Sequence, residues 1–212
     1  MAKSIAQSLR LCGVLGLILV VAYVLQPQEP PSSAASGSGL PPGYSTTVTG
    51  EIHDFDFYFG AWTVHSRRLK ARNAGSKDWN ELSSVICVTP YLNGAVNVSE
   101  MYSTVSGSSG LTLRTFDSEK RQWSVHYISS KTGQLDAGMF GGFDGAKGTF
   151  FGADVDSGQT IKARIVWTKV DPDHVRWEQA FSYDNRTWET NWISEMTRAN
   201  PSITCEGGHP KH

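Results

Sequence analysis

The chain has 212 residues, with 19 lysines and arginines against 20 aspartates and glutamates. This near balance leaves no excess of positive charge that would attract nucleic acid. The 21 glycines and the 11% aromatic content are typical of a β domain rich in turns, and the chain is long enough for one domain with one core.

The N-terminal residues 1–26 predict export. Lys3 and Arg10 precede an unbroken apolar run at residues 11–25, so the N-terminus should stay in the cytoplasm while the remainder crosses the membrane. The run is short for a spanning helix, which needs about 20 residues, and near the upper length of a signal-peptide core. Residues 1–26 are therefore interpreted as a signal peptide or an uncleaved signal anchor. The predicted location is periplasmic or otherwise extracytoplasmic with an inner-membrane anchor, and secretion after cleavage is the alternative.

Residues 27–50 are rich in proline, serine and glycine, which is typical of a semi-flexible linker. We expect a β domain at residues 51–199 and a disordered tail at residues 200–212. Cys87 lies in a strand-like run and Cys205 lies in the tail. In an exported protein these two cysteines can form a disulfide, or Cys87 can remain an unpaired core residue, and the sequence leaves both alternatives open.

Turn signals recur from Asn93 to Arg186 and divide the domain into about ten strand-like runs. The last three runs alternate between apolar and polar residues with a period of two, which is the pattern of a half-buried strand. An antiparallel sheet of this length is expected to close on itself to hide its edges. The predicted fold class is all-β, a single up-and-down antiparallel barrel of about ten strands.

Loop lengths predict the register of the last strands. A three-residue loop at residues 171–173 places Trp167 opposite Trp177. A two-residue loop at residues 184–185 gives three further pairs, which are Trp177 with Trp192, Gln179 with Thr190, and Phe181 with Trp188. In the earlier run at residues 121–129, Trp123, Val125 and Tyr127 share a face, which Leu111 and Leu113 can join.

A barrel of about ten strands has a wide interior, since eight strands already suffice to hold one small ligand. The predicted inner wall is mostly aromatic with a few polar groups, as in sites for small apolar or aromatic molecules. A tightly packed aromatic core without a cavity is the alternative. The residues expected to line the site are Trp62, Trp123, Tyr127, Trp167, Trp177, Gln179, Phe181, Trp188, Thr190, Trp192 and Arg198.

The segment Gly60-Ala61-Trp62, which follows a short aromatic stretch, resembles the Gly-x-Trp signature of the calycin superfamily of lipocalins, fatty-acid-binding proteins and nitrobindins. The resemblance implies that Trp62 closes one barrel end and that Arg198, at the end of the last strand, packs over its ring. Residues 62–69, 176–182 and 188–192 also resemble an uncharacterised bacterial lipocalin-like family. This second resemblance spans residues 53–198 and implies a fold but no activity.

No residue set predicts catalysis, a cofactor or a metal site. His65 and His126 face away from the aromatic wall and have no second ligand at metal-site spacing, so we expect surface histidines rather than metal or haem ligands. Arg176, Glu178 and Glu189 are placed on the outer face, with Glu178 opposite Asn191. They form either a solvated ladder or an acid/base surface. The alternative functions are thus an enzyme on this scaffold and a packed-core envelope interaction protein.

Overall fold

The structure is a computed structural model that describes residues 50–211. The predicted export signal and nearly all of the predicted linker lie outside the described residues. Among residues 50–211, no helix has the length and apolar character needed to cross a bilayer.

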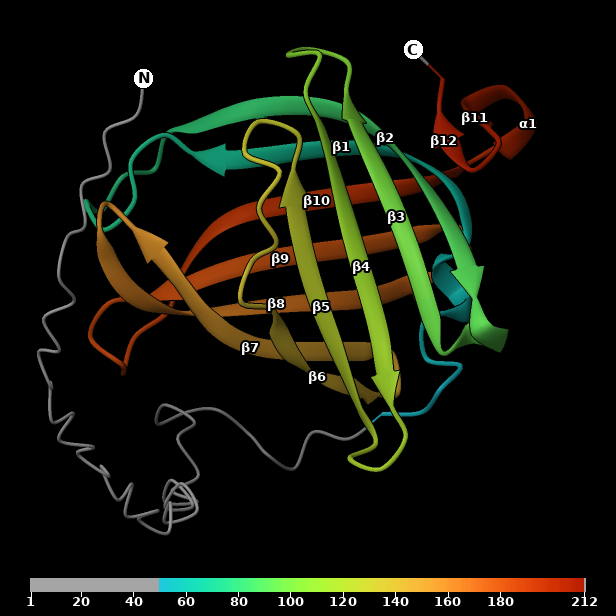
Figure 1. Ribbon diagram of the computed structural model, residues 1–212. Helices are drawn as coiled ribbons and strands as arrows, with labels where there is room; N and C mark the ends of the chain where they lie inside the picture. The colour runs from blue at the N-terminus through green and yellow to red at the C-terminus, as the bar shows by residue number, and fades with distance from the viewer. Residues whose placement is uncertain (1–49, 212) are drawn as a thin grey trace, which may run out of the picture. The chain divides into compact units, whose positions relative to one another are not determined.

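The fold is all-β, as predicted, and ten strands form a closed antiparallel barrel in which sequence neighbours pair and the last strand closes on the first (Figure 1). The strands are β1 (Gly60–Leu69), β2 (Trp79–Tyr91), β3 (Val96–Ser103), β4 (Ser109–Asp117), β5 (Gln122–Ser129), β6 (Met139–Asp144), β7 (Lys147–Asp156), β8 (Gln159–Asp171), β9 (His174–Ser182) and β10 (Glu189–Ala199). Short 3-10 helices are η1 (Asp56–Tyr58) and η2 (Leu92–Gly94), and the C-terminal segment holds α1 (Pro201–Thr204), β11 (Cys205–Glu206) and β12 (His209–Pro210).

Alternation along β8 places its apolar side chains inside the barrel. Ile161, Ala163, Ile165 and Trp167 are all buried and belong to the core. Trp167 lies opposite Trp177 of β9, which confirms the predicted register of this hairpin. Paired residues lie on the same side of a sheet. The inward-facing residues of one strand therefore identify those of the next strand around the barrel.

The segment at residues 50–59 closes one end of the barrel. Phe55 and Tyr58 are 0% and 1% exposed. Two inward-facing indoles hold this segment: Trp62 Nε1 donates to the Tyr58 carbonyl at 2.8 Å, and Trp123 Nε1 donates to the Glu51 carbonyl at 3.0 Å. The closed end is thus a packed aromatic floor, defined here as Phe55, Tyr58, Trp62, Trp123 and Trp167.

Arg198 fastens the floor from the end of β10. Its guanidinium lies 4.3 Å from the centre of the Trp62 ring, and it donates to the carbonyls of Phe57 at 2.7 Å and Phe59 at 3.1 Å. The contact between Trp62 and Arg198 that the sequence predicted is confirmed.

Replacing Arg198 with alanine should lower the free energy of unfolding by about 1–3 kcal/mol, because the cation–π contact and the packing of the side-chain stem are lost. Urea denaturation of the variant and the wild type measures the difference. Arg186→Ala, in an exposed loop, is the matched control and should be nearly neutral. Equal costs for the two variants would contradict a fastening role for Arg198.

The hairpin between β9 and β10 differs from the prediction. The connection spans residues 183–188, where the Asp184 carboxylate accepts hydrogen bonds from the backbone N–H groups of Arg186 and Thr187, both at 2.8 Å. These hydrogen bonds hold the pKa of Asp184 below its usual value. A β-bulge then shifts the register between Thr190 and Trp192.

The bulge overturns three predicted pairs. The observed pairs are Trp177 with Ser194, Gln179 with Trp192, and Phe181 with Glu189. Trp188 and Thr190 were predicted inside the barrel but lie on its outer side. Trp188 sits 4.8 Å from the outward-facing Arg164 guanidinium, and Thr190 pairs with the outward-facing Ala180. Glu189, predicted outside, shares the inward face of Phe181, and Glu178 lies opposite Ile193 rather than Asn191.

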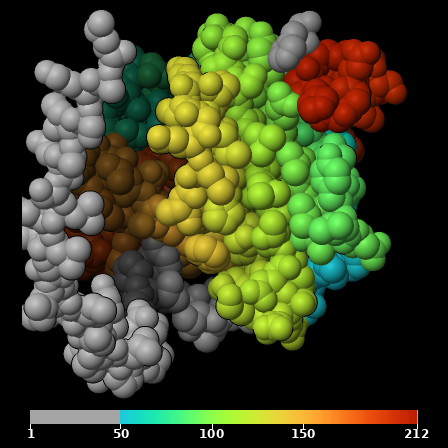
Figure 2. Space-filling model, in the orientation of Figure 1, coloured from blue at the N-terminus to red at the C-terminus, as the bar shows by residue number. Residues whose placement is uncertain are grey.

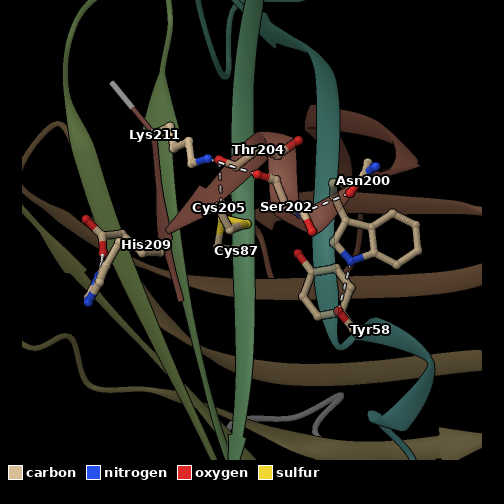
Figure 3. Close-up of a disulfide and its surroundings, with 10 residues drawn as sticks. Tyr58, Cys87, Asn200, Ser202, Thr204, Cys205, His209 and Lys211 are labelled. Atoms are coloured by element: carbon tan, nitrogen blue, oxygen red, sulfur yellow. Dashed lines mark hydrogen bonds and ion pairs between the residues drawn. A yellow bond between two sulfur atoms is a disulfide. The ribbon is translucent and has the colours of Figure 1, made fainter. Parts of the chain in front are cut away.

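The prediction of a disordered tail is wrong for residues 200–211. Cys205 forms a disulfide with Cys87, whose side chain faces outward from β2 (Figure 3). Asn200 caps α1 by accepting from the Ser202 N–H at 3.0 Å, and His209 lies 2.6 Å from Glu100 of β3. Figure 2 shows this segment in red beside the green β3 region. The tail is therefore packed on the outside of the barrel, away from its interior.

Candidate functional site

The predicted site residues separate into two groups inside the barrel. Trp62, Trp123 and Trp167 belong to the floor and are at most 3% exposed. Towards the other end, Trp177, Gln179 and Trp192 also face inward but are only partly buried. We call this partly buried part of the interior the cup, and its residues are Met101, Thr112, Trp177, Gln179 and Trp192.

One wall of the cup is aromatic. The rings of Trp177 and Trp192 meet edge to face with their centres 5.6 Å apart, which is a favourable arrangement for two indoles. The Arg68 guanidinium lies 4.8 Å from the centre of the Trp192 ring. Burial lowers the pKa of Arg68, and the nearby Arg72 adds to the effect. Trp177 and Trp192 thus give the interior a partly exposed aromatic surface with a cation beside it.

The side chains on the inner wall formed by β1 to β3 are small and polar. Ser66 and Ser194 share a hydrogen bond at 2.7 Å, and Ser84, Ser99 and Ser103 are buried on the inward faces of their strands. Small side chains occupy little of the interior of a ten-strand barrel. The interior therefore offers an aromatic surface on one side and hydroxyl groups on the other.

The rim at the open end carries charged and phenolic groups. A cavity of about 280 Å³ opens there, lined by Asn73, Gly75, Phe181, Tyr183, Asp184, Thr187 and Glu189. The Tyr183 hydroxyl donates to Asp156 at 2.8 Å, and Arg72 pairs with the same carboxylate at 2.5 Å. Burial and then the Asp156 carboxylate raise the pKa of Tyr183, so this phenol stays protonated near neutral pH. Tyr127, a predicted site residue, is also inward-facing and is 38% exposed.

Sequence reasoning missed Arg114, which points into the barrel from β4. Arg114 lies opposite Val125, whereas Leu111 and Leu113 face outward, so the suggestion that these leucines join the inner face is wrong. The arginine is 2% exposed, and its Nη1 donates to Asn97 Oδ1 at 3.0 Å and Ser99 Oγ at 3.1 Å. Burial lowers the pKa of Arg114 to about 10, which leaves it charged at neutral pH.

Three aromatic rings of the floor surround the Arg114 guanidinium. The ring centres of Tyr58, Phe55 and Trp167 lie at 5.0, 5.3 and 5.5 Å. No carboxylate among residues 50–211 pairs with it. Arg114 is therefore a buried cation that is stabilised by ring faces and neutral oxygens alone.

The other candidate groups lie on the outside. His65 pairs with Glu81 at 2.9 Å, and the His126 ring packs edge to face against Phe140. Within the described part of the chain, no three His, Cys, Asp or Glu side chains gather as a metal site would require. On the outer face, Arg176 pairs with Glu178, two residues further along β9, and with Glu195 on the neighbouring strand β10. This geometry is that of a solvated ladder.

No family model matches the sequence, and no curated protein matches it. Among solved structures, the chain is similar to a redesigned β-barrel at 11% sequence identity and a TM-score of 0.41. That similarity covers 72% of this chain and 100% of the designed one, and it assigns neither a ligand nor an activity.

Proposed function

We propose that this chain is an exported calycin-like barrel, tethered to the membrane by its N-terminal segment, that binds a small apolar or aromatic molecule in the cup. The observation that carries the proposal is the partial exposure of Trp177, Gln179 and Trp192 although all three face inward. Side chains in a fully packed core are buried on all sides. Indole surface left accessible inside a barrel is surface that an apolar ligand can cover.

The hydrophobic effect supplies the driving force for such binding. An apolar molecule that enters the cup removes both its own surface and the indole faces from water, at about 25 cal/mol per Å². Gln179 places one amide beside Trp192, and a ligand with a polar group can pair with it. The ligand class is therefore apolar with a limited number of polar atoms.

Two further observations support the proposed location and family type. Disulfides persist mainly in oxidising compartments, and Cys87 and Cys205 form one. The ring of Trp62 under the Arg198 guanidinium matches the arrangement that the calycin resemblance implies. Export, the tether and membership of the superfamily are parts of the proposal.

Addition of a fatty alcohol or a small aromatic compound should change the tryptophan emission saturably and raise the melting temperature, with micromolar affinity, or about −8 kcal/mol. Gln179→Leu should weaken the binding of polar-headed ligands more than that of pure hydrocarbons, which need no hydrogen bond. Gln134→Leu, in an exposed loop, is the matched control. If a broad apolar panel changes neither emission nor melting temperature, the packed-core alternative is correct.

A further inference from the structure

We propose that the outer face of the barrel carries a second binding site, separate from the cup, for the acidic sugar units of an anionic polysaccharide. A cavity of about 180 Å³ opens on this face over β7, β8, β9 and β10. Its lining includes Lys147, Phe151, Arg164, Glu178 and Thr190. The inference goes beyond the proposed function and does not depend on it, because these side chains lie on the side of the sheet opposite the cup.

The bulge in β10 gives this outer face an indole ring. Because of the register shift that follows Thr190, Trp188 lies outside the barrel, where its ring centre is 4.8 Å from the Arg164 guanidinium. The centres of the Trp188 and Phe151 rings are 6.1 Å apart. Bulges often occur beside binding sites, where they redirect a side chain. Trp188 thus positions the Arg164 guanidinium beside the cavity by a cation–π contact, and Phe151 contributes an aromatic wall.

Positive charge on this face is not neutralised by the acids of residues 50–211. Lys147, Lys162 and Arg164 lie on the outer sides of β7 and β8, and none of them takes part in an ion pair of the described residues. Lys162 is 4% exposed, and neither its ammonium nor Arg164 Nε has a hydrogen-bond partner there. A buried charge without a partner is costly. A carboxylate supplies the opposite charge, and a guanidinium binds it with favourable geometry.

The other polar groups of the cavity favour a ligand with hydroxyl groups. Thr149 and Thr190 line it with hydroxyls that donate and accept, whereas the Glu178 carboxylate only accepts. Glu178 has its own counter-ion, because its Oε1 lies 3.1 Å from Arg176 Nη2. Sites for drug-sized molecules measure about 300–1,000 Å³, so this smaller cavity suits a single ring. A ring that carries an acid group and several hydroxyls, with an apolar face towards Phe151, is an acidic sugar.

An acidic peptide is less complementary to this face. Peptides that bind to a sheet commonly add a strand to a free edge, where backbone groups are available. Here β7, β8 and β9 are each paired with a strand on both sides, so their backbone groups are already engaged. The face offers its ligand side chains alone. A saccharide needs no backbone partners, because its hydroxyl and acid groups pair with side chains.

The test is a calorimetric titration of the full-length chain with trigalacturonic acid and with its methyl ester, which keeps the rings but lacks the charge. Arg164→Gln removes the guanidinium beside the cavity. Lys147→Gln is a second variant at an exposed position, where the substitution does not disturb the fold. Arg67→Gln is the matched control, because the Arg67 guanidinium lies 5.5 Å from the outer ring of Trp79 and Arg67 is not among the residues that line the cavity.

We expect the wild type and Arg67→Gln to bind the acid at least tenfold more tightly than the ester. Arg164→Gln should bind the two forms equally, and Lys147→Gln should reduce the preference at least threefold. Neither variant should change the binding of a fatty alcohol in the cup.

Three results would overturn the inference and leave the proposed function standing. The first is equal or absent binding of acid and ester by the wild type. The second is a loss in Arg67→Gln as large as that in Arg164→Gln, which would indicate surface charge alone. The third is tighter binding of triglutamate, or of vesicles with anionic lipids, than of the trisaccharide, which would assign the face to a peptide or to a membrane.

Discussion

Replacement of Cys87 and Cys205 by serine is expected to lower the free energy of unfolding by about 4–5 kcal/mol. The disulfide joins residues separated by 118 positions, and a cross-link that closes so long a loop restricts the unfolded chain strongly. Urea denaturation of the double variant and the wild type gives the difference directly. The tail packs outside the barrel, so ligand binding in the cup should not change.

Cys12→Ser is the matched control, because the disulfide joins Cys87 to Cys205. A reducing agent should destabilise the wild type and Cys12→Ser alike, and it should leave the double variant unaffected. A double variant as stable as the wild type would show that the link between the tail and β2 does not contribute to folding stability.

Phe55→Ala should be the most damaging single change in the floor, with a loss of about 3–5 kcal/mol. Phe55 is 0% exposed, and its ring meets those of Trp123, Phe143 and Trp167 with centres 4.9, 5.0 and 5.4 Å apart. Alanine leaves a cavity at the centre of this cluster and also removes one of the rings that face Arg114. Thermal and urea unfolding measure the cost.

Phe140→Ala provides the comparison, because this ring is 41% exposed on the outer face. The same change in chemistry there should alter the free energy of unfolding by about 0.5 kcal/mol or less. If the two phenylalanine variants lose equal stability, residues 50–59 do not form the floor of the barrel.

Alternation of side chains was sufficient to predict the barrel and the facing of Trp167 and Trp177. Each strand buries one face only, so a period of two identifies the inward residues once the strand limits are known. The connection of β8 and β9 has a two-residue turn at residues 172–173 and a register shift between Lys169 and Asp171, which together give the same pairing of Trp167 with Trp177 as the predicted three-residue loop.

The facing of Trp188 and Thr190 was not predictable from alternation. One additional residue at the bulge between Thr190 and Trp192 reverses the inward and outward faces of Glu189 and Thr190 relative to the strand from Trp192 onward. The longer loop, closed by the Asp184 side chain, also removes the two-residue turn on which the predicted register depended. A bulge has no reliable signal in hydrophobic periodicity.

Arg114 escaped sequence reasoning because hydrophobic patterning assigns leucine inward and arginine outward. On β4 the reverse holds, and Leu113 lies outside, opposite His126. A strand that places a polar side chain inside the barrel breaks the pattern by which core strands are recognised. The turn at residues 118–121 sets the face of this strand, and its length was not evident from the sequence.

Binding inside the cup is tested most directly by quenching of tryptophan emission with 10-bromo-1-decanol, because bromine quenches only the indoles that it contacts. Two double variants are compared. One combines Trp177→Phe and Trp192→Phe and so removes the inner pair of indoles. The other combines Trp79→Phe and Trp188→Phe and removes an outer pair. Trp79 faces outward beside Arg67, as Trp188 does beside Arg164. Saturable quenching should persist in the outer variant and be lost in the inner one. Quenching that is lost in the outer variant, or absent from the wild type, would contradict a ligand site inside the barrel.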